Sequence, residues 1–177
     1  IEVRLTVVPC EGWRRDQLGD ATGVVWPDPS PNMRRLEQAI LYPGVGLLET
    51  TNISVGRGTD TPFELFGAPW VRPRELAAAL NTADTPGVRF VPRWFTPDAR
   101  VFSGERCGGV DLVLTDPDGV NSVDLGLTIA ATLRRLYPDE WKTERYNRLL
   151  INGELHQAVI DGASATVLHR LARRELD

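Results

Sequence analysis

The sequence is poor in cysteine, lysine and long apolar runs, and each shortage excludes a class of protein. Its two cysteines, Cys10 and Cys107, are too few for a disulfide scaffold. They either pair or stay as thiols, and we expect two buried thiols because free cysteines are usually buried. No run approaches the roughly twenty apolar residues of a membrane-spanning helix. Lys142 is the only lysine, and the formal net charge of −4 argues against nucleic acid or an anionic membrane as the main partner.

The sequence also lacks the motifs of metal and nucleotide sites. His156 and His169 have no second ligand at metal-binding spacing, so we expect packing or surface roles for them and no metal. Residues 44–46 and 56–58 each begin like a dinucleotide fingerprint. Neither has the third glycine, and neither clearly opens a helix, so no cofactor is predicted.

The apolar pattern predicts a mixed α/β fold in one domain, which is the natural number for 177 residues. We expect a modest, largely antiparallel sheet covered by C-terminal helices. The period of the apolar residues predicts strands at 1–8, 44–50, 63–66, 88–95 and 110–115. Pro92 would place the fourth of these at an edge or a bulge. Helices are predicted at 33–40, from Pro73 onward, and at 122–137, 146–150, 155–160 and 165–176.

A long polar loop, residues 50–61, separates two short apolar runs, and loops of this length are usually functional or disordered. Arg57 lies in it between Gly56 and Gly58. The glycines allow positive φ and a close approach of the backbone to a ligand, and arginine offers a fork of donors to a carboxylate or phosphate. The simpler alternative is an ordered turn in which Arg57 pairs with Glu49 or Glu64.

Four strings in this region resemble one bacterial family: SPN at 30–32, YPG at 42–44, E-x-T-N-x-S-x-G-R-G-T-x-x-P-F-E at 49–64, and GAPW at 67–70. The family is the NamZ exo-β-N-acetylmuramidases, formerly called DUF1343. They are peptidoglycan hydrolases that release N-acetylmuramic acid from non-reducing ends. The resemblance is dense from about residue 11 to residue 70 and weaker through 107–109 and the C-terminal helices.

The resemblance implies how the chain is organised. Family members join a Rossmann-like N-terminal domain to a C-terminal domain, and residues 1–177 resemble the second of these, with 1–41 at the junction. The isolated chain is then expected to be inactive, because half of the cleft is absent. The implied partners are a peptidoglycan-derived sugar and the N-terminal domain of the same polypeptide. The implied location is extracytoplasmic, although no signal peptide opens this chain.

The resemblance and the loop together nominate site residues. Glycoside hydrolysis needs two positioned carboxyl groups. Glu49 is the candidate catalytic carboxylate because it ends an apolar run, and Glu64 is the expected structural partner of Arg57. Asn32 is alternatively a helix cap, and Trp13 an anchor to the core. The predicted substrate-binding residues are Trp13, Asn32, Asn52, Ser54, Gly56, Arg57, Gly58 and Thr59. A non-catalytic binding wall and a purely structural or interaction module are the competing hypotheses.

Overall fold

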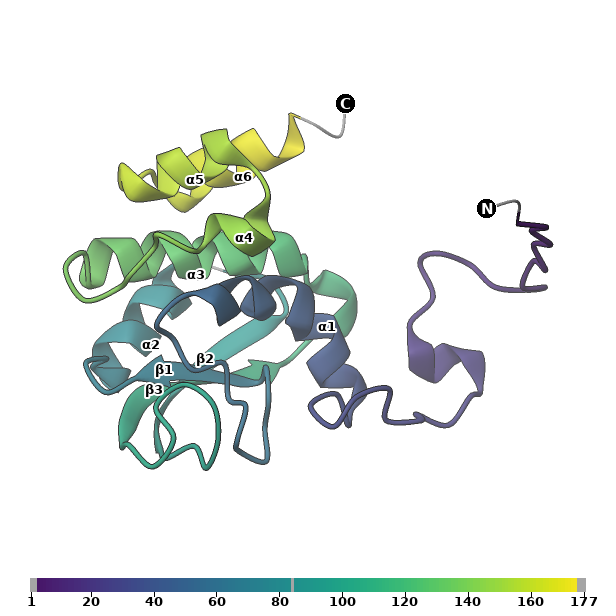
Figure 1. Ribbon diagram of the computed structural model, residues 1–177, viewed down its shortest axis with the longest axis horizontal. Helices are drawn as coiled ribbons and strands as arrows, with labels where there is room; N and C mark the ends of the chain where they lie inside the picture. The colour runs from purple at the N-terminus through teal and green to yellow at the C-terminus, as the bar shows by residue number, and fades with distance from the viewer. Residues whose placement is uncertain (1–2, 84, 175–177) are drawn as a thin grey trace.

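The chain folds into a small sheet with helices packed over one face, preceded by an extended arm, residues 3–35 (Figure 1). The computed structural model describes residues 3–83 and 85–174. The elements, in order, are η1 (Gly19–Thr22), α1 (Leu36–Val45), η2 (Gly46–Thr50), β1 (Leu65–Ala68), α2 (Pro73–Thr82), β2 (Val88–Phe95), β3 (Cys107–Leu114), η3 (Pro117–Gly119), α3 (Ser122–Leu136), α4 (Asn147–Leu150), α5 (Gly153–Ile160) and α6 (Ala165–Arg173). The predicted mixed α/β class is confirmed. No helix in these described ranges is both long enough and apolar enough to cross a bilayer.

The sheet is antiparallel, with β3 in the centre and β1 and β2 on either side. The strand predicted at 88–95 is confirmed residue for residue, and Pro92 does lie on an edge strand, where its missing N–H breaks no ladder. The strand predicted at 63–66 begins two residues later, at Leu65. Gly67 of β1 lies so close to β3 that an added Cβ would be 2.2 Å from the Gly108 carbonyl oxygen.

The helices form layers above the sheet. Helix α2 packs on β2 and β3, α3 packs on α1, α2 and α6, and α5 lies beside α6 (Figure 1). Helices α1 and α3 touch through glycines: a Cβ on Gly44 would be 1.9 Å from the Ser122 carbonyl oxygen. The resulting core runs from the sheet to the last helix and includes the buried aromatic residues Phe66, Phe90, Tyr137, Trp141 and Tyr146.

The strand predicted at 44–50 is wrong. Helix α1 continues to Val45, and a 3-10 helix, η2, follows it directly. Leu41, Val45 and Leu48 are all buried, and their spacing of four and three residues is that of one helix face. The helix predicted at 33–40 instead begins after Arg35, so Asn32 is not its cap.

The strand predicted at 1–8 is also wrong for its described residues. Residues 3–8 pair with no strand, and Val3, Leu5 and Val7 are 78%, 81% and 76% exposed. Residues 1–2 lie outside the described part, as do residues 175–177 of the last predicted helix. An alternating segment forms a half-buried strand only where another layer covers its apolar side, and nothing in the described ranges covers residues 3–8.

Candidate functional site

Backbone pairing on both sides fixes the polar loop. Ser54 and Gly67 exchange two N–H···O bonds of 2.9 Å each, and the N–H of Phe63 donates to the carbonyl of Val55 at 2.8 Å. Gly56 and Gly58 have φ values of +77° and +80°. A Cβ on Gly58 would be 2.4 Å from the backbone nitrogen of Ala99. The glycines therefore serve a tight turn that lies against the segment 96–106.

Arg57 pairs with Glu49. Its Nε donates to Glu49 Oε1, and its Nη2 lies 3.2 Å from Oε2. The guanidinium carbon also lies 5.1 Å from the centroid of the Phe63 ring. The two paired side chains are 28% and 22% exposed, so the pair is held firmly but still faces solvent. Of the two carboxylates considered as partners of Arg57, Glu49 and Glu64, the structure pairs it with Glu49.

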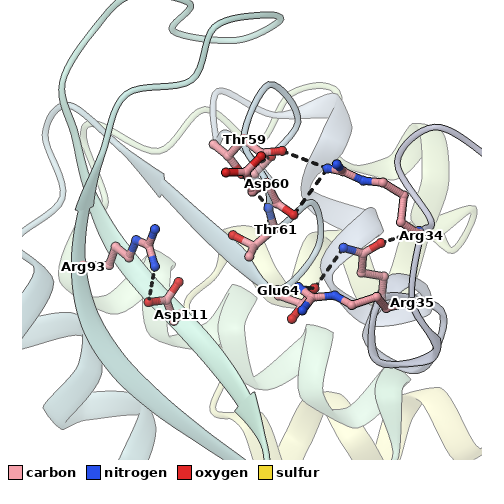
Figure 2. A network of polar contacts seen from close by, with 10 residues as sticks. Arg34, Arg35, Thr59, Asp60, Thr61, Glu64, Arg93 and Asp111 are labelled. Atoms are coloured by element: carbon pink, nitrogen blue, oxygen red, sulfur yellow. Dashed lines mark hydrogen bonds and ion pairs between the residues drawn. The ribbon is translucent and has the colours of Figure 1, made fainter.

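The prediction that Glu64 is the partner of Arg57 is therefore wrong. Glu64 belongs to a different network (Figure 2). Its Oε1 accepts from Arg35 Nη2 at 2.6 Å and from Gln38 Nε2 at 2.9 Å. Gln38 is fully buried, and its side-chain oxygen Oε1 accepts a hydrogen bond of 2.6 Å from the backbone N–H of Arg34. Glu64 thus ties the end of the polar loop to the beginning of α1.

A cavity of about 520 Å³ lies beside the Glu49–Arg57 pair. Three predicted site residues line it: Glu49, Ser54 and Arg57. Its remaining described lining residues are Ile53, Val55, Arg100 and Val101. Neither Arg100 nor Val101 was predictable as a site residue, because both lie in a turn-rich segment that shares no motif with the loop.

Residues 40–177 match the family model described as exo-β-N-acetylmuramidase NamZ, C-terminal. The chain belongs to the NamZ family. It is 40% identical over 167 residues to the peptidoglycan β-N-acetylmuramidase NamZ of Bacillus subtilis (strain 168), covering 93% of this chain and 40% of that protein.

Two crystal structures of DUF1343 family proteins from Bacteroides fragilis NCTC 9343 share the fold. The alignment with the first has a TM-score of 0.70 and 29% identity, and it covers 92% of this chain and 42% of the other protein. The alignment with the second has a TM-score of 0.60 and 24% identity, and it covers 84% of this chain and 40% of the other protein. This NamZ-family chain thus spans about two fifths of the length of these relatives.

The other predicted binding residues do not line the cavity beside Arg57. Gly58 and Thr59 line a separate cavity of about 510 Å³, together with residues that include Arg34 and Asp98. Thr59 uses its hydroxyl in the turn, where Oγ1 donates to the Gly56 carbonyl at 2.6 Å. Gly56 itself is buried.

Asn52 holds two backbone groups of a distant segment. Its Nδ2 donates to the Glu140 carbonyl at 2.8 Å, and its Oδ1 accepts the Lys142 N–H at 2.7 Å. It lines a third cavity, of about 330 Å³, which shares Val101 with the cavity beside Arg57. This pairing connects the polar loop to the segment that follows α3.

Asn32 and Trp13 lie before α1 and away from the cavity. Trp13 is 54% exposed and does not anchor the arm to the core. Asn32 donates its backbone N–H to Ser30 Oγ at 3.3 Å. The structure does not bring either residue to the Glu49–Arg57 pair.

The cysteines differ from each other. Cys10 is exposed and Cys107 is buried, so the expectation of a buried thiol is confirmed for Cys107 and wrong for Cys10, and the two do not pair. Burial, with a smaller contribution from the charge of Glu105, raises the pKa of the Cys107 thiol to about 11. Cys107 packs with Leu65 and Phe95 in a small cluster under the segment 96–106.

Proposed function

We propose that this chain is the C-terminal part of an exo-β-N-acetylmuramidase and forms one wall of its active-site cleft. The observation that carries the proposal is the cavity lined by Glu49, Ser54 and Arg57. All three belong to the longest string that marks the family. The relative from Bacillus subtilis is a peptidoglycan β-N-acetylmuramidase, and the matching family model bears the same activity in its name. The substrate of this proposed activity lies in the cell wall, so we expect the enzyme to act outside the cytoplasm.

The chemistry requires more than this chain supplies. Glycosidases use two carboxyl groups, about 5–5.5 Å apart for retention or about 6.5–9.5 Å apart for inversion. Glu49 is the only carboxylate among the described residues that line the cavity. Glu49 remains the catalytic candidate of this chain, oriented by its two contacts with Arg57. The second carboxyl group then comes from the part of the protein that relatives have in addition.

The N-terminal arm supports a shared site. The match to the family model of the C-terminal domain begins at residue 40. The alignment with the Bacillus subtilis relative is longer, at 167 residues, and extends well into the arm. Besides Val3, Leu5 and Val7, the arm exposes Val24 and Val25. Exposed apolar side chains gathered on one segment are typical of a surface that another part of a protein covers. We assign that covering role to the additional part of the same polypeptide.

Release of N-acetylmuramic acid from a chromogenic β-N-acetylmuramide tests the proposal. We expect turnover by the full-length protein, and none by residues 1–177 alone although they fold, as judged by circular dichroism and a cooperative thermal melt. Turnover by the 177 residues alone would contradict the shared site. A full-length protein that is folded but releases no N-acetylmuramic acid would contradict the activity.

The competing structural role has one observation in its favour, which is that Arg57 already pairs with a carboxylate. In the full-length enzyme, Arg57→Lys separates the two roles, because lysine keeps the charge and loses the fork. A site role predicts a loss of kcat/KM with little change in melting temperature. A structural role predicts a lower melting temperature with kcat/KM preserved below it.

A further inference from the structure

We propose that Arg100 binds the lactyl carboxylate of N-acetylmuramic acid. The inference rests on the proposed function and names the group of the substrate that the cavity recognises. The sequence suggests Arg57 as the residue that binds an anionic group. We assign that role instead to Arg100, which lies in a different segment.

The charges in the cavity point to Arg100. Three charged side chains line it: Glu49, Arg57 and Arg100. Glu49 and Arg57 neutralise each other, and two of the donors of Arg57 are already used. The guanidinium of Arg100 makes no hydrogen bond or ion pair with any residue in the described ranges. The cavity therefore carries one uncompensated positive charge, which fits a ligand with a single negative charge.

The backbone around Arg100 is held in place. Arg100 has a φ of +68°, in the left-handed region that a non-glycine residue enters at a conformational cost. The N–H of Asp98 donates to the Gly58 carbonyl at 2.8 Å, and the N–H of Gly104 donates to the Pro97 carbonyl at 2.8 Å. Phe102 packs on the small apolar cluster that contains Cys107. The hydrogen bond from Asp98 to Gly58 therefore holds the segment that carries Arg100 against Gly58, which directly follows Arg57.

The substrate offers a matching group. N-Acetylmuramic acid differs from N-acetylglucosamine by a lactyl ether at O3, which carries one carboxylate and one methyl group. An arginine fork binds a carboxylate through two parallel hydrogen bonds. Val101 supplies exposed apolar surface in the same cavity, which is also lined by the buried Ile53 and Val55, and such surface suits a methyl group. Arg100 thus binds the charge, and the Glu49–Arg57 pair stays intact next to it.

Inhibition of the full-length enzyme by N-acetylmuramic acid and by its lactyl methyl ester tests the assignment. The ester keeps the sugar and removes the charge. Arg100→Ala should weaken inhibition by the acid about ten- to hundredfold, as for a lost hydrogen-bonded charge pair, and leave inhibition by the ester unchanged. Arg100→Lys should fall between wild type and Arg100→Ala. Arg106→Ala is the control, because Arg106 lies over Trp94, 4.5 Å from the ring centroid, and does not line the cavity.

The outcomes separate this inference from the proposed function. An active wild type whose preference for acid over ester survives in Arg100→Ala and Arg100→Lys would overturn the role of Arg100 and leave the activity intact. Equal weakening of acid and ester would overturn it as well. A folded wild type that neither turns over the muramide nor binds the acid would overturn both. A melting curve of each variant identifies loss of fold.

Discussion

Replacing Glu64 with glutamine tests the network that joins the polar loop to α1 (Figure 2). Glutamine has the same shape but no charge. The change removes the ion pair with Arg35 and converts the bond from Gln38 to a neutral one. The effect is expected on stability, because Glu64 lies outside the cavity beside Arg57.

The magnitude follows from exposure. Arg35 is 51% exposed, so solvent screens its ion pair with Glu64, which is worth about 0–1 kcal/mol. Gln38 is fully buried, and weakening its hydrogen bond from a charged to a neutral acceptor costs about 1 kcal/mol. The sum is about 1–2 kcal/mol, which lowers the melting temperature of a domain of this size by roughly 2–8 °C. Glu64→Ala should cost about 1–3 kcal/mol more, because the buried Gln38 amide then loses its acceptor.

Thermal and urea unfolding, followed by circular dichroism, measure these changes. Arg35→Ala is the matched control, since it removes only the exposed half of the network and should cost about 0–1 kcal/mol. The expected order of destabilisation is Glu64→Ala, then Glu64→Gln, then Arg35→Ala. The hydrogen bond from the buried Gln38 is not the main stabilising contact of the network if Glu64→Gln is as stable as wild type. The same conclusion follows if Arg35→Ala is as destabilised as Glu64→Ala.

Three further predictions concern close packing, thiol burial and the candidate carboxylate. Gly67→Ala should destabilise the fold by about 1–3 kcal/mol in urea unfolding, because the added Cβ would meet the backbone of a neighbouring strand. Gly153→Ala is the control and should not destabilise the fold, because nothing lies within 4 Å of its added Cβ; equal effects of the two substitutions would contradict the role of close packing. A thiol reagent at pH 8 should label one cysteine, Cys10, in the native chain and two after unfolding, because Cys107 is buried with a pKa of about 11; two labelled thiols in the native chain would show that Cys107 is accessible. Glu49→Gln in the full-length enzyme should cut turnover by orders of magnitude at a stability cost of only about 1 kcal/mol, and unchanged turnover would move the catalytic carboxyl groups to the rest of the protein.

The elements that the sequence predicted best are those with a clear period and a clear stop. Residues 88–95 have the composition of a strand, and Pro92 restricts that strand to an edge. The run from Val45 to Leu48 is too short to distinguish helical from strand periodicity, and burial of Leu41 one turn earlier decides for the helix. Residues 3–8 have a strand pattern, but they pair with no strand in the described part of the chain.

The candidate site was predictable only in part, because its contacts join distant segments. The pair of Arg57 with Glu49 spans eight residues and was one of two alternatives that the sequence offered. The contact of Glu64 with Arg35 spans 29 residues and depends on where α1 begins. Arg100 reaches the cavity only because the segment 96–106 folds back onto Gly58, and the sequence contains no local signal for that contact.

Filling the cavity tests the central claim, that it is the part of the active site contributed by this domain. Val101 lines the cavity, whereas Val113 is an exposed valine of β3 that does not line it. In the full-length enzyme, Val101→Trp should reduce turnover of the chromogenic β-N-acetylmuramide by about hundredfold or more by displacing the sugar, with a normal melting curve. Val113→Trp should leave turnover unchanged. If the folded Val101→Trp enzyme is as active as wild type, the cavity is not part of the active site.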